Sequence, residues 1–272
     1  MRVFFHPVSA FRWFYVAGKI FPSQPRYLSM EGFILAAGLG TRLKPLTDHR
    51  PKALVEVNGV TLLELAINKL QQSGVHRIVV NVHHFGQQVI DFLDSRTWEA
   101  EVVVSDERQL LMDTGGALKQ AAPLFSGTEP IVVHNVDILS NLNLTAVLES
   151  HRAQKALATL CVSRRTTGRQ LLFTPEGKLC GWRNRQMGDE LWTDVPHPDA
   201  TELAFSGISI VEPQLLDLLP PANHPYPVIP CYLEIAKTHI INAFEHPAEH
   251  WLDVGKPETL AQAEQWNDFC KK

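Results

Sequence analysis

The stretch LAAGLGTRLKPLT, residues 35–47, determines how the rest of this 272-residue chain is interpreted. It follows a short apolar run that predicts a buried strand, and it opens into a loop rich in glycine and basic residues. Gly38 and Gly40 allow the backbone to approach a ligand closely and to point N–H groups at phosphate oxygens. Arg42 offers a planar fork to the same oxygens, and Lys52 adds a point charge. The pattern predicts a phosphate-binding loop at the end of a strand.

Two common nucleotide-binding motifs do not fit this loop. A dinucleotide fingerprint, G-x-G-x-x-G, requires a third glycine where this chain has Leu43. A Walker motif requires Gly-Lys-Ser/Thr after four intervening residues, and that string does not follow. A nicotinamide-dependent enzyme is one alternative, and it predicts binding of NAD without Mg²⁺. A plain turn with solvated basic residues is the alternative without a ligand.

Outward from the loop, predicted strands and helices alternate. The expected strands cover residues 33–37, 77–82, 102–104, 131–133 and 157–162. The expected helices cover residues 62–70, 87–93, 117–121 and 144–153. Thr61 and Glu64 form a capping box at the start of the first helix. Alternation of this kind favours a three-layer α/β fold with a mixed, mostly parallel sheet.

The pattern changes near residue 165. A hairpin is expected over residues 171–183, with the turn Pro-Glu-Gly-Lys at its centre. The remaining expected elements are strands at 205–211, 240–244 and 251–252, and helices at 213–219, 229–237 and from 257 onward. This order of expected elements predicts an antiparallel insertion within one α/β domain.

The charge balance excludes some partners. The chain has 25 basic and 29 acidic residues, for a formal net charge of −4. Without an excess of positive charge, nucleic acid is not an expected partner. The four cysteines are scattered and form no C-x-x-C pair, which is typical of reduced thiols in the cytoplasm. No apolar run reaches the ~18 residues of a membrane span.

Residues 1–29 differ in composition from residues 30–272. They contain four basic residues, no acidic residue and eight of the 23 aromatic residues in the chain. Prolines and basic residues interrupt the apolar stretch, so neither a secretory signal nor a long amphipathic helix is expected. We interpret residues 1–29 as a non-domain extension, with Met30 as an alternative start, and residues 30–272 as the domain.

The glycine-rich loop resembles the signature of nucleotidyltransferases that make nucleotide sugars from a nucleoside triphosphate and a sugar 1-phosphate. That signature reads G-x-G-T/S-R-x-x-P-x-T, with P-K some residues later. The matching residues here are Gly38, Gly40, Thr41, Arg42, Pro45, Thr47, Pro51 and Lys52. The resemblance covers residues 31–266 and implies a Rossmann-like fold with a sugar-binding insertion. It implies catalytic roles for Arg42 and Lys52, which neutralise phosphates.

Two aspartates are expected to hold Mg²⁺. Asp137 follows the fourth strand, at the edge of the sheet where α/β proteins bind ligands, and Asp253 precedes the last helix. From the residues alone, Asp137 could be a turn residue and Asp253 a helix cap. The resemblance implies that both are metal ligands, which suits an ion that takes one or two carboxylates plus substrate phosphates.

The resemblance also implies contacts to the base, the triphosphate and the sugar. The expected nucleotide-binding residues are Ala36, Ala37, Gly38, Gly40, Thr41, Asn81, Thr114 and Gly115. Thr114 and Gly115 belong to a Thr-Gly-Gly turn at a helix start, which is also a ready anion site. The expected sugar-binding residues are Gly207, Glu202, Asn184 and Lys237.

The implied reaction is attack by the sugar 1-phosphate on the α-phosphorus of the nucleoside triphosphate, with release of pyrophosphate. Among short members of the family, the strings DTGGAL, FSGISI and WLDVGKPE most resemble uridylyltransferases that use UTP and N-acetylmuramate 1-phosphate in cell-wall recycling. Guanylyltransferases acting on mannose or heptose 1-phosphate remain an alternative. A non-catalytic nucleotide-sugar sensor is an alternative of another class. Monomer and small homo-oligomer are both left open.

Overall fold

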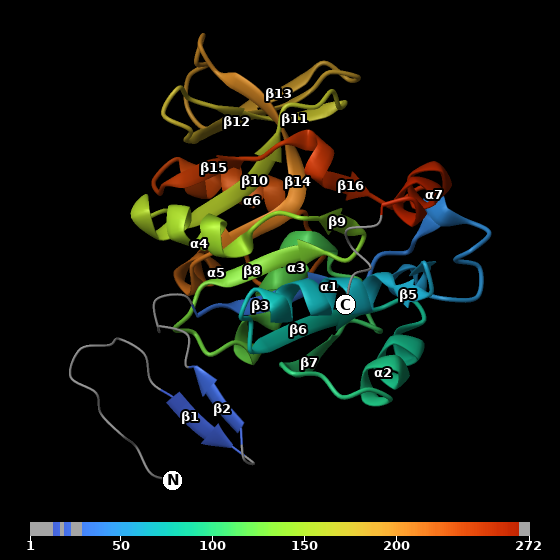
Figure 1. Ribbon diagram of the computed structural model, residues 1–272. Helices are drawn as coiled ribbons and strands as arrows, with labels where there is room; N and C mark the ends of the chain where they lie inside the picture. Colours follow the sequence, from blue (N-terminus) through green and yellow to red (C-terminus); the bar gives the residue numbers. More distant parts are fainter. Residues whose placement is uncertain (1–12, 17–18, 23–28, 267–272) are drawn as a thin grey trace.

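The computed structural model describes residues 13–16, 19–22 and 29–266 (Figure 1). Strands β1 (Trp13–Val16) and β2 (Lys19–Pro22) pair antiparallel. Most of the extension expected over residues 1–29 lies outside the described residues, so the boundary at Met30 stays a prediction. Within the described ranges, no helix is long and apolar enough to cross a membrane.

Four parallel strands form one half of the main sheet. They are β3 (Glu31–Leu35), β6 (Arg77–Val82), β7 (Glu101–Asp106) and β8 (Ile131–Asn135). Their order is β8-β3-β6-β7, and in register Ile34 lies between Val80 and His134. Because the strands run in the same direction, their carboxyl ends meet at one edge of the sheet, where ligands bind in such folds.

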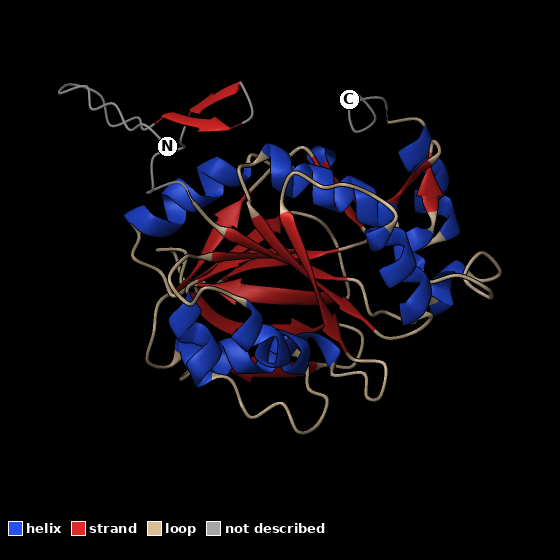
Figure 2. Cartoon of the chain, turned by 90° about the horizontal axis from the view of Figure 1, so that it is seen from below, coloured by secondary structure: helices blue, strands red, loops and turns tan. Residues whose placement is uncertain are grey.

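Both faces of the sheet are covered, so its strands are apolar on both sides. Ile34 and Val80 point into one core, while Phe33 and Val79 point into the other. The first core is closed by α1 (Leu62–Gln72), α2 (Gly86–Asp94), α4 (Leu144–Ala153) and α7 (Pro257–Glu264). The second core is closed by α3 (Asp113–Ala121), α5 (Pro213–Leu218) and α6 (Val228–Ala236). Figure 2 shows helices on both sides of the sheet.

The second half of the sheet is mainly antiparallel. Strands β11 (Arg169–Phe173), β12 (Leu179–Asn184) and β13 (Asp189–Trp192) form the predicted insertion, at the top of Figure 1. The long strand β14 (Thr201–Val211) pairs with β11 at its start and with β8 and β10 (Ala158–Ser163) at its end. Strand β14 therefore runs through the insertion and into the main sheet, and joins the two.

Short elements complete the chain. Strand β9 (Ile138–Ser140) pairs antiparallel with β16 (Trp251–Asp253), and β15 (Ile241–Glu245) pairs parallel with β10. The others are β4 (Glu56–Val57), β5 (Val60–Thr61) and the 3-10 turns η2 (Thr41–Leu43), η3 (Lys52–Leu54), η4 (Ala122–Leu124) and η5 (Ala248–His250). The predicted α/β fold with an antiparallel insertion is confirmed.

Candidate active site

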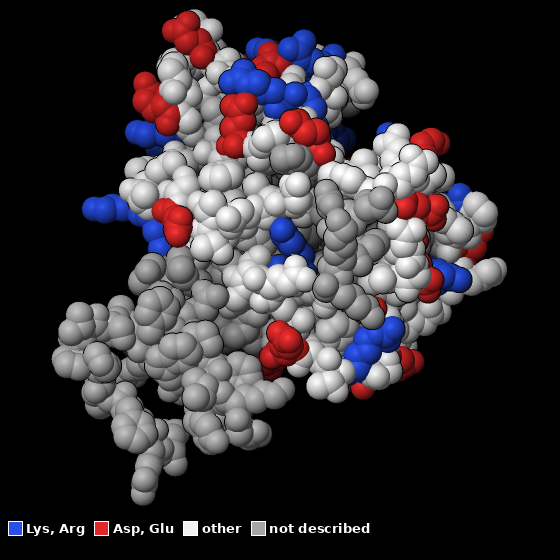
Figure 3. Space-filling model, viewed as in Figure 1, with Lys and Arg blue, Asp and Glu red and all other residues white. Residues whose placement is uncertain are grey.

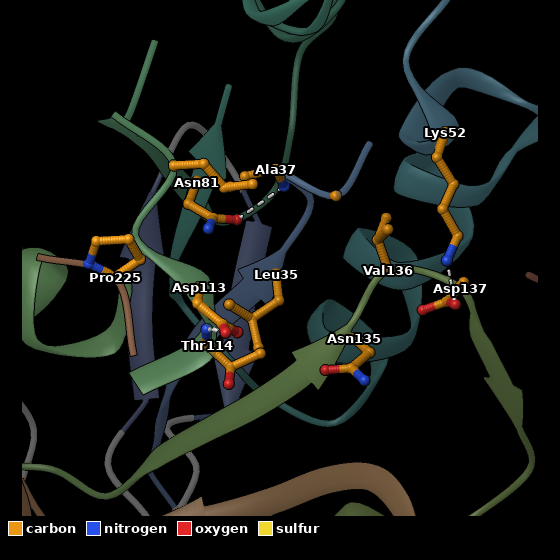
Figure 4. A pocket seen from close by; sticks show the side chains of 12 residues that line it. Leu35, Ala37, Lys52, Asn81, Asp113, Thr114, Asn135, Val136, Asp137 and Pro225 are labelled. Atoms are coloured by element: carbon orange, nitrogen blue, oxygen red, sulfur yellow. Dashed lines mark hydrogen bonds and ion pairs between the residues drawn. The ribbon is translucent and has the colours of Figure 1, made fainter. Parts of the chain in front are cut away.

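A cavity of about 490 Å³ lies at the carboxyl edge of the parallel strands. Its lining comes from the ends of β3, β6 and β8, from the start of α3 and from the loop before α6. The lining residues are Leu35, Ala37, Gly38, Lys52, Asn81, Leu111, Asp113, Thr114, Asn135, Val136, Asp137 and Pro225. In Figure 4, Asn81 and Thr114 lie toward one end, and Lys52 and Asp137 lie at the other. We call this space the nucleotide cavity.

A buried polar network holds the start of the glycine-rich loop. The side-chain oxygen of Asn81 accepts hydrogen bonds from the amides of Ala36 (2.6 Å) and Ala37 (3.1 Å). The amide nitrogen of Asn81 donates to Glu107 Oε1 (2.8 Å), and Glu107 Oε2 accepts from the amide of Met112 (3.0 Å). Burial raises the pKa of Glu107, and these two hydrogen bonds oppose that rise. Because Asn81 occupies the amides of Ala36 and Ala37, those two N–H groups are not directed at a phosphate.

The exposed part of the loop is shaped by Gly40. Its φ of 65° is left-handed, and an added Cβ would lie 2.9 Å from Thr47 Cγ2 and 3.0 Å from Lys52 Cβ. Thr47 donates to the carbonyl of Gly40 (2.8 Å) and fixes the return of the chain. Gly38 and Thr41 are exposed. The glycine therefore lets the segment that carries Lys52 pack against the loop.

The two aspartates meet although they are far apart in sequence. In the β9–β16 pair, Asp253 lies opposite Ile138, the residue after Asp137. The amide of Val254 donates to the carbonyl of Asp137 (2.9 Å), which continues the pairing. A Cβ added to Gly255 would lie 2.8 Å from Asp253 Oδ1, 2.9 Å from Asp137 Oδ2 and 2.6 Å from Arg42 Nη2. Both carboxylates and Arg42 thus converge on one point above Gly255.

The charges at this point are balanced. The Lys52 ammonium forms an ion pair with Asp137, and both side chains are mostly buried. Arg42 lies between the aspartates, 3.9 Å from Asp137 Oδ2 and 3.8 Å from Asp253 Oδ2. The described residues contain no cluster of three or more metal-ligating side chains. Two carboxylates that converge beside a glycine fit an ion that takes its other ligands from water and phosphates, as Mg²⁺ does.

The Thr-Gly-Gly segment forms the first turn of α3 and not a free loop. Thr114 lines the nucleotide cavity, and its hydroxyl oxygen accepts from the amide of Val228 (2.9 Å). Gly115 is buried: its amide donates to the carbonyl of Tyr226 (2.9 Å), and an added Cβ would lie 2.6 Å from the Tyr226 ring. Gly115 therefore allows the loop before α6 to pack closely on α3, and it does not line the cavity.

A second cavity, of about 370 Å³, lies between the insertion and the main sheet. It is lined by Asn135, Ile138, Arg165, Thr167, Arg169, Gln170, Leu171, Trp182, Phe205, Gly207, Ile229, Trp251 and Asp253. Asn135 lines both cavities, and Asp253 faces this one. Gly207 has a φ of 71°, and a Cβ there would lie 2.8 Å from Asn135 Nδ2. We call this space the sugar cavity, after the substrate that we expect to bind there.

Arg165 is fixed at the sugar cavity by three contacts. Its guanidinium carbon lies 3.4 Å from the centre of the Trp251 ring, Nε donates to Ser163 Oγ (3.0 Å), and Nη2 donates to the carbonyl of Phe205. Burial lowers the pKa of Arg165 to about 10, and the charge of Asp253 opposes part of this shift. No sequence signal pointed to Arg165, because two of its three partners, Phe205 and Trp251, come from distant strands.

Three expected sugar-binding residues do not line the sugar cavity. Glu202 forms ion pairs with Arg183 and Arg185. Asn184 is buried, and its side-chain oxygen accepts from the amide of Gln186 (3.1 Å) in the turn after β12. Lys237 pairs with Glu234 at the end of α6. Each of these three side chains is engaged by a neighbour away from the cavity. Of the four residues expected to bind the sugar, only Gly207 lines the cavity.

Sequence reasoning also missed two other residues, Glu107 and Asn135. Glu107 directly follows β7 and Asn135 ends β8, so both stand where parallel strands present side chains to a ligand. Their positions at strand ends were the available signal.

Comparison with known proteins identifies the class. A family model described as nucleotidyl transferase matches residues 31–170, and the chain belongs to this family. This confirms the family predicted from the glycine-rich loop. One curated relative, the N-acetylmuramate alpha-1-phosphate uridylyltransferase of Caulobacter vibrioides, is 32% identical over 85% of this chain and 94% of its own length. The protein of the same name from Neisseria meningitidis serogroup B is 29% identical over 86% of this chain and 97% of its own.

A solved structure supports the fold. HddC from Yersinia pseudotuberculosis, complexed with GMP-PN, matches with a TM-score of 0.70. The match covers 87% of this chain and 99% of that chain at 22% sequence identity. This likeness confirms the three-layer fold with its insertion.

Proposed function

We propose that this protein transfers UMP from UTP to N-acetylmuramate 1-phosphate and releases pyrophosphate. A phosphate oxygen of the sugar 1-phosphate attacks the α-phosphorus of UTP. The bond between the α-phosphorus and the oxygen bridging to the β-phosphate breaks, and pyrophosphate leaves with that electron pair. The product is UDP-N-acetylmuramate.

The observation that carries the proposal is the position of the charged cluster. Arg42, Lys52, Asp137 and Asp253 converge where the nucleotide cavity and the sugar cavity adjoin. A reaction between two phosphates needs this arrangement, because each substrate enters from its own cavity and the reacting groups meet between them. A nicotinamide-dependent reaction does not require a cluster of charged side chains between two cavities.

The chain's own residues supply positioning and charge. Lys52 and Arg42 neutralise phosphate oxygens as the pentacoordinate transition state forms. Asn81 is a positioning residue that holds the loop through Ala36 and Ala37. No general base is required, because a phosphate monoester has a second pKa near 6 and is already ionised at pH 7.

Asp137 and Asp253 would hold Mg²⁺. When bound, the ion supplies charge neutralisation to the phosphates of UTP and of the sugar phosphate. The ion pairs of Lys52 and Arg42 with these carboxylates hold both aspartates pointed at the same place. With the ion held by the carboxylates, Lys52 and Arg42 would be available to bind the phosphates.

The choice of substrates follows the curated relatives, two of which are named for this activity. UDP-N-acetylmuramate synthesis would place the protein in cell-wall recycling and in the cytoplasm. A Mannose-1-phosphate guanyltransferase of Pichia angusta is also similar, at 27% identity, which keeps a GTP-dependent reaction as the runner-up.

The test is a matrix of substrates. The protein is incubated with Mg²⁺, each of UTP, GTP, CTP and dTTP, and a panel of sugar 1-phosphates, and pyrophosphate release is measured. The proposal expects the highest kcat/KM for UTP with N-acetylmuramate 1-phosphate. A different preferred pair would keep the reaction and replace the substrates. Nucleotide binding without any turnover would favour a non-catalytic sensor.

A further inference from the structure

The arginines of the insertion fall into two groups. Arg164, Arg183 and Arg185 form ion pairs with Glu245, Glu190 and Glu202. Arg165 and Arg169 line the sugar cavity and, among the described residues, have no carboxylate within 4 Å. Basic and acidic side chains lie close together on the surface of the insertion at the top of Figure 3. Among these five arginines, the two without a carboxylate partner are therefore the two that line the cavity.

Arg165 is held ready for an anion. Ser163, the carbonyl of Phe205 and the Trp251 ring fix the plane of its guanidinium. Two of the five N–H groups that a guanidinium carries are used in this way, and the remaining ones have no protein partner among the described residues. A fixed fork with free donors loses little entropy when it binds a carboxylate, because it is already in place.

The negative charge of the 1-phosphate has its own partners, at the charged cluster of Arg42, Lys52, Asp137 and Asp253. There two cations and two carboxylates balance, and a bound cation would add the positive charge that the phosphates need. Arg165 and Arg169 come in addition to this cluster, on the loop and strand that follow β10. Asp253 is the one carboxylate that lines the sugar cavity among the described residues, and it also pairs with Arg42. Two arginines therefore face a single shared carboxylate, and a neutral sugar would leave the excess positive charge without a partner, at a cost in desolvation.

We propose that Arg165, assisted by Arg169, recognises a carboxylate on the sugar itself and selects acidic sugar 1-phosphates over neutral ones. This inference rests on the proposed function. N-acetylmuramate carries such a group on its lactyl ether, and N-acetylglucosamine, otherwise the same sugar, does not. The two sugars therefore differ by the carboxylate that Arg165 is placed to bind.

The experiment compares kcat/KM with UTP for N-acetylmuramate 1-phosphate and N-acetylglucosamine 1-phosphate. It uses the wild type, Arg165→Gln and Arg165→Lys, with Arg164→Gln as the matched control because Arg164 is exposed and pairs with Glu245. We expect the wild type to prefer the acidic sugar. In Arg165→Gln this preference falls about 10- to 100-fold, the range expected for lost hydrogen bonds to a charged group. Arg165→Lys recovers only part of it, because a lysine keeps the charge and loses the fork, and Arg164→Gln keeps the wild-type ratio.

Equal losses with both sugars in Arg165→Gln would overturn the inference, because they would assign Arg165 to the phosphate or to folding. Arg169→Gln, whose side chain is exposed, repeats the test if Arg165→Gln does not fold. Calorimetric binding of N-acetylmuramate 1-phosphate gives a readout that does not need turnover.

Glucuronate and glucose 1-phosphates form a second pair of substrates. A preference for glucuronate 1-phosphate that Arg165→Gln abolishes would keep carboxylate recognition even if N-acetylmuramate 1-phosphate is not the substrate. A wild type that prefers neutral sugars in both pairs would overturn the inference while leaving nucleotidyl transfer intact.

Discussion

The nucleotide cavity and the sugar cavity are built from different kinds of structure. The first is formed by the carboxyl ends of parallel strands, and the loop that closes it is continuous in sequence from Leu35 to Lys52. The second is formed by antiparallel strands of the insertion, by β14 and by β16, which approach from distant parts of the chain. A buried amide–carboxylate pair, Asn81 with Glu107, braces the first. An arginine stacked on a tryptophan braces the second.

This difference shows how one fold can keep a reaction and change its acceptor. The groups expected to handle the nucleotide and the phosphates are held by buried hydrogen bonds and by close packing around glycines, so few substitutions fit there. The sugar cavity takes its lining from several separate elements and includes exposed side chains such as Arg169, where substitutions cost less stability. Three predictions test this division, from the largest expected effect to the smallest.

Removing Asp137 is expected to damage both cavities at once. Asp137→Ala takes away one of two converging carboxylates and leaves Lys52 and Arg42 with one partner fewer. We expect kcat to fall by about 10²–10³-fold or more, as when a group that stabilises a transition state is lost. The measurement is pyrophosphate release as a function of Mg²⁺ concentration, with the exposed Asp194→Ala as control. Near-normal Mg²⁺-dependent turnover in Asp137→Ala would refute the metal assignment.

Acid is expected to destabilise the fold at β8, where the parallel half of the main sheet meets the antiparallel half. His134 lies in β8 with Ile34 of β3 on one side and Ile208 of β14 on the other, and it is fully buried. Burial lowers the pKa of His134 from 6.5 to about 4. Below pH 6.5 the unfolded chain binds a proton that the folded ring does not, so the free energy of unfolding falls as the pH drops from 6.5 to 4, by about 3 kcal/mol at most.

Denaturant unfolding at several pH values measures this slope. In His134→Gln the side chain does not titrate, and the contribution to the slope from this position disappears. An unchanged slope in His134→Gln would show that other groups cause the acid sensitivity.

Substitutions at two glycines in the left-handed conformation are expected to affect the two cavities separately. Gly40→Ala crowds Thr47 and the stem of Lys52 and is expected to raise KM for UTP, whereas Gly207→Ala crowds Asn135 and is expected to raise KM for the sugar 1-phosphate. Each effect is expected to be about tenfold, with ~1–3 kcal/mol of backbone strain. Gly127→Ala is the control, because its φ of 75° gives the same strain and no atom lies within 4 Å of the new Cβ. If either variant changed both KM values equally, the division between the cavities would be wrong.

Much of the fold could be predicted because its signals are local. Strand β6 and helix α4 have the bounds that the sequence predicted, and Thr61 caps α1 by accepting from the amide of Glu64 (3.2 Å). Strand β13 (Asp189–Trp192) was not predicted, because its D-E-L-W sequence lacks alternation and it is stabilised by pairing with β12. Strand β9 was also missed, since only three residues pair and their partner, β16, is more than a hundred residues away.

The candidate site divides in the same way. Sequence reasoning named Lys52 and both aspartates, which the structure places at the two cavities, because they stand in recognisable strings. Their roles stay predictions, and the amides of Ala36 and Ala37, expected at the nucleotide, instead donate to Asn81. Sequence reasoning did not find Arg165, whose orientation depends on Ser163, Phe205 and Trp251 together, and it did not foresee that Glu202 is occupied by two arginines. Contacts of this kind arise from tertiary packing and leave no pattern along the chain.

The pairing of β9 with β16 also sets a time at which the protein can begin to work. On a ribosome that adds ~5–20 residues per second, Asp137 emerges on the order of ten seconds before Asp253. During that interval the glycine-rich loop, Lys52 and Asp137 already exist, but the strand that brings the second carboxylate has not been made. A nascent or prematurely ended chain would thus contain the residues of the four parallel strands while lacking one of the four residues of its charged cluster. Catalytic competence would arrive only once Asp253 and the rest of β16 have been synthesised.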